Sequence, residues 1–81
     1  MTYTATLIAP RTFRVAPNRA LTNIRPIGLD RALAKLKRRG VQVERFGISG
    51  HAQITLPLVM RNEGDTDAIT AEDMTYFLNH Q

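Results

Sequence analysis

The sequence predicts a small two-layer α+β domain, in which a mainly antiparallel sheet is covered on one face by two helices. Three observations lead to this prediction. Apolar and polar residues alternate in two separate stretches, a leucine-spaced helix follows the first stretch, and a capped amphipathic helix follows the second. The resulting order β-β-α-β-β-α is typical of such domains. The chain has 81 residues and room for one hydrophobic core, so we predict a single domain over residues 1–81.

The N-terminal stretch is expected to form a hairpin. Residues 2–9 alternate between apolar and threonine positions, apart from Ile8, and the segment 12–15 resumes the alternation. The pair Pro10-Arg11 between them is not a favoured two-residue turn, so the hairpin is predicted from the alternation alone.

An amphipathic helix is predicted between Gly28 and Gly40. Its apolar face carries leucines spaced i, i+4 and i+7, and Gly40 follows a basic last turn, as is typical of a left-handed helix terminator. Residues 18–23 before it are interpreted as a loop with at most one helical turn, because Pro26 disfavours helix at the preceding residue. The leucines are Leu29, Leu33 and Leu36.

Two further strands are expected after this helix, joined by a turn at 47–50. The valines at 41 and 43 and the apolar residues at 46 and 48 fall on opposite sides of the first strand. A β-bulge near Glu44-Arg45 is predicted to restore a common buried face. Residues 52–60 alternate cleanly and are predicted to form one strand, whose end at Pro57 should lie at a sheet edge.

The C-terminal segment is predicted to be a polar acidic loop over 61–66 and a helix from Ala71 to about Asn79. Thr70 has the form of an N-cap, and Asp73 stands at the fourth position of a capping box. Ile69 and Met74 have the spacing of a hydrophobic staple.

Charge is distributed unevenly along the chain. The net charge is +4, but residues 1–45 hold ten of the eleven basic and two of the seven acidic residues, which gives +8 against −4 for residues 46–81. This asymmetry predicts a basic surface for an acidic partner, although a solvated and internally balanced surface would give the same pattern. The chain has no cysteine and no apolar run near the ~20 residues that span a bilayer, so we expect a soluble, cytoplasmic protein.

Catalytic and metal motifs are weak, and we expect a non-enzymatic protein without a cofactor. The only serine, Ser49, lies two residues before His51, a spacing more typical of an ordinary hairpin turn than of a nucleophile and its base. The acidic run 63–67 does not match a calcium loop and is better interpreted as solvated. Neither His51 nor His80 has a ligand-spaced partner for zinc.

The basic face of the central helix is the main candidate site. Arg31, Lys35 and Arg38 line up opposite the leucines over about two turns, where they could neutralise phosphates of a nucleic acid or of a nucleoprotein assembly. A solvated helix face is the competing interpretation. Four further arginines could extend this surface: Arg11, Arg14, Arg19 and Arg25.

The central helix and the segment after it form a local pattern over about residues 29–58. The helix ends in Arg-Arg-Gly and is followed by Val-Gln-Val-Glu-Arg-Phe, a glycine turn and an alternating strand. This pattern is similar to the recognition helix and wing of winged-helix DNA-binding proteins. The resemblance implies that Arg31, Lys35 and Arg38 approach the major groove and that the turn at 47–50 approaches the backbone. Such domains carry two helices before the recognition helix, whereas strand-like, proline-interrupted sequence precedes it here, so the family is not assigned.

A protein partner is the alternative. A compact domain without a catalytic motif also fits a protein–protein inhibitor or adaptor of the phage or mobile-element accessory type, which would occlude an acidic surface of a larger host protein or complex. The same basic face, or an exposed strand edge that pairs with another chain, would make the contact. A dimer through a strand edge is one form of that pairing.

Overall fold

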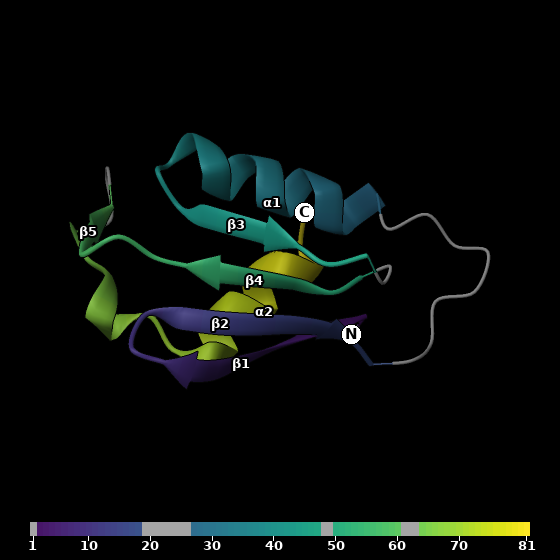
Figure 1. Cartoon of the computed structure of the whole chain (residues 1–81), viewed down its shortest axis with the longest axis horizontal. Helices are drawn as coiled ribbons and strands as arrows, with labels where there is room; N and C mark the ends of the chain where they lie inside the picture. The colour runs from purple at the N-terminus through teal and green to yellow at the C-terminus, as the bar shows by residue number, and fades with distance from the viewer. Residues whose placement is uncertain (1, 19–26, 48–49, 61–63) are drawn as a thin grey trace.

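The computed structural model describes residues 2–18, 27–47, 50–60 and 64–81 and confirms the predicted α+β domain (Figure 1). A four-stranded antiparallel sheet and a small two-stranded sheet combine with two helices and a 3-10 turn. The elements in chain order are β1 (Tyr3–Ala9), β2 (Thr12–Pro17), α1 (Ile27–Arg38), β3 (Gln42–Arg45), β4 (Ala52–Thr55), β5 (Val59–Met60), β6 (Gly64–Asp65), η1 (Thr66–Ala68) and α2 (Ala71–Asn79).

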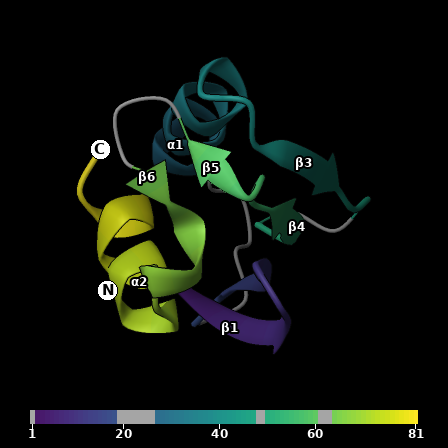
Figure 2. The same cartoon turned by 90° about the vertical axis from the view of Figure 1, so that its left-hand side faces the viewer.

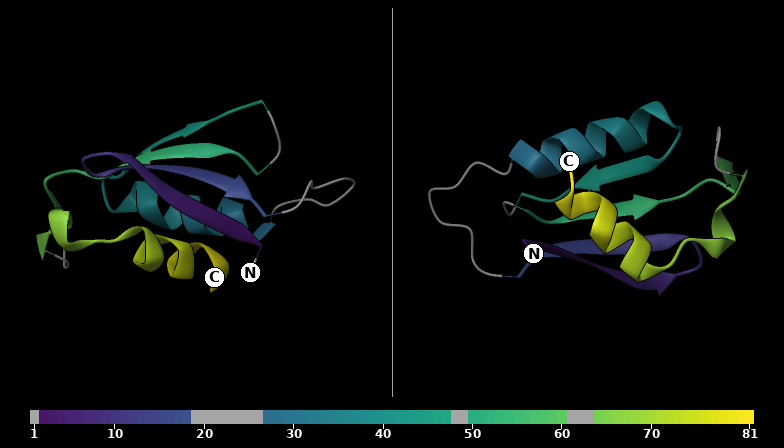
Figure 3. Two further views of the ribbon diagram at one scale, coloured as in Figure 1. Left: turned by 90° about the horizontal axis from the view of Figure 1, so that it is seen from below. Right: turned by 180° about the vertical axis from the view of Figure 1, so that it is seen from behind.

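The main sheet has the strand order β1-β2-β4-β3, so β1 and β3 are its edges. Both helices lie on one face of this sheet, as predicted, and the other face is uncovered by helix (Figure 3). α1 contacts β3 and α2, and α2 contacts β1 (Figure 2). Because α1 leads directly into β3, the two elements run antiparallel to each other along one side of the domain.

The hydrophobic core lies between the sheet and the two helices. The apolar face of α1 is buried as predicted, and it packs in one cluster with inward-facing residues of the strands and of α2. The largest fully buried side chains are Phe13, Leu29, Ile54, Leu78, Val15 and Thr66.

The N-terminal hairpin forms, and a bulge helps to close it. β1 pairs with β2 in regular register up to Leu7, then shifts before Ala9, which accounts for the break in alternation at Ile8. Arg11 in the turn has φ +57°, a left-handed conformation that a non-glycine residue rarely adopts. The bulge therefore occurs in β1.

The bulge predicted near Glu44-Arg45 is wrong. β3 pairs with β4 without a register shift from Gln42 to Arg45. The change in apolar phase has another cause, because Phe46 contacts Arg14, whose guanidinium lies 4.7 Å from the ring centroid. Phe46 thus belongs with the open face of the sheet.

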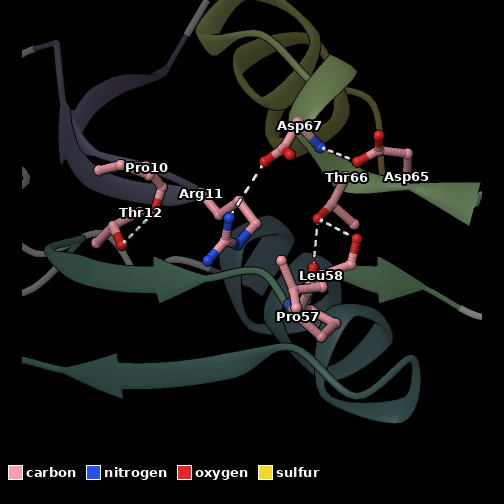
Figure 4. Close-up of polar contacts among 8 residues, drawn as sticks. All are labelled: Pro10, Arg11, Thr12, Pro57, Leu58, Asp65, Thr66 and Asp67. Atoms are coloured by element: carbon pink, nitrogen blue, oxygen red, sulfur yellow. Dashed lines mark hydrogen bonds and ion pairs between the residues drawn. The ribbon is translucent and has the colours of Figure 1, made fainter.

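The prediction of one strand over residues 52–60 is also wrong. β4 ends at Thr55, ahead of Pro57, and β5 then pairs with β6 in the second sheet, so part of the predicted acidic loop is strand and 3-10 turn. The buried Thr66 hydroxyl hydrogen-bonds the Pro57 carbonyl and lies 3.1 Å from the Leu58 carbonyl (Figure 4). Since Pro57 cannot donate to a ladder, it ends the strand instead of lying along an edge, and Leu58 is 65% exposed.

Local signals set the helix ends as predicted. After α1, Gly40 has φ +90°, its N–H donates to the Lys37 carbonyl, and the Val41 N–H donates to the Leu36 carbonyl, the pattern of a Schellman motif. At the start of α2, Thr70 and Asp73 make both hydrogen bonds of a capping box, at 3.1 and 3.0 Å. Of the loop predicted over 18–23, residues 19–23 lie outside the described residues.

Candidate functional site

The three cations predicted on the central helix all lie exposed on α1, opposite its buried leucines. In the part of the chain that the structure describes, none of them is within ion-pair distance of a carboxylate. Arg38 makes one local contact, from its Nε to the Ala34 carbonyl at 3.4 Å. The face of α1 that carries Arg31, Lys35 and Arg38 is called the α1 cation line below.

Arg11 does not extend this line. Its Nη1 lies 3.2 Å from the Asp67 carboxylate (Figure 4). Its carbonyl accepts a hydrogen bond from the Leu56 N–H at 2.8 Å. These contacts tie the β1–β2 turn to η1 and to the chain after β4. The role of Arg11 in this geometry is structural.

Arg14 lies on the open face of the sheet, away from the helices. In the strand pairing it stands opposite Thr6 on one side and Gln53 on the other, with its Nη2 3.3 Å from Gln53 Oε1. Its guanidinium also covers the Phe46 ring. Arg14 and the α1 cation line therefore belong to opposite sides of the molecule, while Arg19 and Arg25 lie outside the described residues.

Lys37 is an exposed cation in the basic last turn of α1, which the sequence indicated only as part of the helix end. Each residue turns an α-helix by about 100°, so Lys37 shares a side of α1 with Asp30, seven residues earlier. Asp30 is ion-paired with Arg45 of β3, which shows that this side of α1 faces β3. Helical spacing alone predicts that Lys37 and Asp30 share a side of α1. Only the Asp30–Arg45 ion pair shows that this side lies next to β3.

The acidic residues gather around η1 and the start of α2, and most of them have structural partners. Asp65 accepts a hydrogen bond from the Asp67 N–H at 2.9 Å, and Asp73 completes the capping box. Glu72 is exposed in the first turn of α2, where a negative charge suits the helix dipole. Within the described ranges, no group of three or more His, Asp or Glu side chains is placed to hold a metal ion.

The open face of the sheet is polar and nearly neutral in charge. It carries threonine, glutamine and arginine side chains together with Glu44, and a shallow hollow of about 340 Å³ lies over β3 and β4. Among the described residues, Arg14 and Glu44 balance each other on this face, which leaves it no excess of positive charge for phosphates. The two residues weighed above as a nucleophile and its base, Ser49 and His51, are not both described: His51 is half-buried, and Ser49 lies outside the described residues.

A second hollow, of about 200 Å³, lies between the end of α1 and the first half of α2. Its lining is mainly apolar, with Leu36, Met60 and Phe77 among its residues, and Arg39 and Asp73 add one charge of each sign. Arg39 also lies over the Phe77 ring, 5.9 Å from its centroid. No nucleophile or histidine lines this hollow within the described residues, so it carries no set of catalytic groups.

Tyr3 has a perturbed pKa at the other end of α1. Burial raises the pKa of its hydroxyl above 10.0, the nearby Asp30 carboxylate raises it further, and Arg45 partly offsets both effects. Tyr3 is buried beside the Asp30–Arg45 ion pair, which is a stabilising arrangement.

Comparison of the chain with protein-family models, with curated proteins and with solved structures finds no match in any of the three. The winged-helix resemblance is limited to local order. A helix is followed by two antiparallel strands, as that pattern implies, but two strands of the same sheet precede it. No helix in the described part of the chain has the length and apolar character needed to cross a membrane.

Proposed function

We propose that this protein is a non-enzymatic binding protein that contacts nucleic acid, free or in a nucleoprotein assembly, through the α1 cation line. The observation that supports this most is that Arg31, Lys35 and Arg38 are exposed along one helix face without a carboxylate partner among the described residues. Affinity for nucleic acid comes mainly from Lys and Arg neutralising phosphates. The proposed location is the cytoplasm, consistent with a cysteine-free sequence.

The dimensions of the line suit a sugar–phosphate backbone. From the first to the last of its three cations, α1 rises by about 10 Å, at about 1.5 Å per residue. One strand of a duplex advances about 3.4 Å along the duplex axis per phosphate, so the line covers about three phosphate steps, and its three cations can each meet one phosphate. Cation–phosphate contacts carry no sequence information, so binding is expected to be independent of base sequence.

A salt titration of binding to a random duplex tests this proposal. Three phosphate contacts predict that log K falls with log salt with a slope of about −2.7, and Arg31→Ala/Lys35→Ala should reduce that slope by about 1.8. The matched control is Arg14→Ala/Lys37→Ala. It removes the same number of positive charges, one from the open sheet face and one from another side of α1. Equal slopes for the two variants, or no binding at low salt, would exclude the α1 cation line as the site.

A protein–protein inhibitor or adaptor that occludes an acidic surface is the second candidate. It is favoured by the uncovered edge strand β3, which lies beside the exposed Lys37. A pull-down from lysate, with and without nuclease, separates the two functions. A stoichiometric protein that survives nuclease treatment supports the second candidate, whereas recovery that depends on intact nucleic acid supports the first.

A further inference from the structure

The two edges of the main sheet differ in whether side chains hydrogen-bond their outward backbone groups, and on β1 side chains of α2 do so. Asn79 Oδ1 accepts hydrogen bonds from the N–H groups of Thr2 and Tyr3 at 2.8 and 2.9 Å, and Asn79 Nδ2 donates to the Tyr3 carbonyl at 2.8 Å. Thr75 Oγ1 accepts from the Ala5 N–H at 2.9 Å. Two side chains one turn apart on α2 thus occupy the outward backbone groups of Tyr3 and Ala5, in the first half of β1, where another strand would pair.

The β3 edge has no such cover. The Phe46 N–H donates to the His51 carbonyl at 3.2 Å, so in an antiparallel ladder Gln42, Glu44 and Phe46 bond inward to β4 while Val43 and Arg45 point outward. Across the residues that the structure describes, no side chain or main chain hydrogen-bonds the backbone groups of Val43 or Arg45. An edge of this kind is a template for an additional strand.

The charged side chains beside the β3 edge determine which side-chain charges an added strand could carry. On the helix side, Arg45 is compensated by Asp30, whereas Lys37 is exposed and has no carboxylate partner in the described ranges. The outer faces of α1 beyond Lys37 carry Arg31 and Arg38. On the open side of the sheet the edge presents Glu44. An added strand would therefore need acidic side chains toward α1 and uncharged or basic side chains opposite Glu44.

We propose that an extended acidic segment of a partner protein adds to β3 as a fifth strand of the main sheet. Its backbone would pair with the outward groups of Val43 and Arg45, and its helix-side carboxylates would meet Lys37. This surface is distinct from the α1 cation line, and its occupation does not require nucleic acid.

A second copy of the chain fits this edge poorly. In a two-fold antiparallel pairing that matches Val43 with Arg45, Glu44 would lie opposite Glu44 of the second copy, and like charges in that position are destabilising. Such a pairing also keeps the α1 helices on the same face of the joined sheet, so their exposed cations would lie near one another. The charge pattern therefore disfavours the dimer through this edge and favours an acidic partner.

Short synthetic peptides test the proposal directly. The probe is a capped nine-residue peptide of alternating glutamate and threonine, and the controls carry lysine in place of glutamate or methyl groups on alternate backbone nitrogens. Binding of the glutamate peptide should slow amide hydrogen exchange at Val43 and Arg45 and leave Tyr3 and Ala5 unchanged. Both control peptides should fail to slow it.

Two variants separate the backbone and charge contributions. Val43→Pro removes an outward N–H without removing a ladder bond to β4, and should weaken peptide binding about tenfold, the effect of one lost hydrogen bond. Lys37→Glu keeps the backbone intact and should weaken binding about threefold to tenfold, as expected when an exposed attraction becomes a repulsion. If Val43→Pro fails to fold, the methylated peptide gives the same test on the native chain.

Four results would overturn the proposal. The first two are that millimolar glutamate peptide leaves amide exchange at Val43 and Arg45 unchanged, or that the lysine peptide slows it equally. The third is that exchange there slows when the protein concentration alone is raised, and the fourth is that a duplex slows it and the peptide does not. The third would make a second copy the occupant, and the fourth would make nucleic acid the occupant. Absence of duplex binding by the native chain, with peptide binding retained, would leave this inference standing without the α1 function.

Discussion

Replacing Asn79 by alanine should destabilise the protein far more than its place in the last turn of a terminal helix suggests. The Asn79 amide group hydrogen-bonds the N–H groups of Thr2 and Tyr3, the Tyr3 carbonyl, and the Thr75 carbonyl, the last at 2.7 Å. All but the last of these join α2 to the edge of β1. The substitution removes all of them and leaves the outward backbone groups of Tyr3 without their side-chain partner.

The expected loss follows from how exposed each group is. The Thr2 N–H is exposed and water can replace its partner, whereas the contacts of Tyr3 are partly buried and are not fully replaced. At about 0.5–1.5 kcal/mol net per hydrogen bond, Asn79→Ala should lower the free energy of unfolding by about 2–3 kcal/mol. A chain of this length is expected to have about 4–12 kcal/mol in total, so the loss is a substantial fraction of it.

Urea denaturation followed by circular dichroism measures this difference, with an unchanged m-value as the sign that the native state keeps its compactness. Thr75→Val, which removes the hydroxyl that pairs with Ala5, should cost about 1 kcal/mol. His80→Ala is the control, because His80 is exposed and stacks only on Tyr76, and it should change stability by about 0.5 kcal/mol or less. A loss below about 0.5 kcal/mol for Asn79→Ala, with amide exchange at Tyr3 unaltered, would refute the reasoning.

Three further perturbations test other parts of the fold. Thr70→Ala should lower the free energy of unfolding by about 1 kcal/mol in urea titrations, because it removes the N-cap of α2 and leaves the Asp73 N–H without its acceptor. Gly40→Ala should cost about 1 kcal/mol in the same assay, because φ +90° is unfavourable for a residue with a Cβ. Tyr3 should make stability fall at alkaline pH: its folded pKa is raised above 10.0, so its contribution is complete below pH 10.0 and is lost as the pH rises through the folded pKa. Denaturation midpoints between about pH 9 and 12 should show this fall in the native chain, and a Tyr3→Phe chain with the same fall would contradict it.

The elements that the sequence predicted well are those whose signals are local. The leucine spacing and Gly40 define α1, because the helix period and the left-handed terminator act within a few residues. Thr70 and Asp73 define the start of α2 for the same reason. The alternation in residues 2–9 predicted β1, although it left the turn and the bulge of the hairpin undetermined.

The wrong predictions involve partners that are distant in sequence. Residues 52–60 alternate like one strand, yet Thr66 hydrogen-bonds the backbone at Pro57 and the chain turns into the second sheet. The bulge expected near Glu44 was a reasonable explanation of an apolar phase change, but Phe46 finds its contact with Arg14, thirty-two positions earlier. Alternation within one strand cannot indicate that an aromatic ring will pack beneath a guanidinium on the opposite face.

For the binding surfaces, the sequence by itself determined that Arg31, Lys35 and Arg38 share one side of a helix, because helical periodicity fixes it. It could not determine which other cations join them. Only the tertiary structure decided that Arg11 pairs with Asp67, that Arg14 lies on the opposite side of the molecule, and that α2 closes β1 and leaves β3 open. Those outcomes depend on which strands pair and on where the helices dock, and both are set by packing between residues distant in the chain.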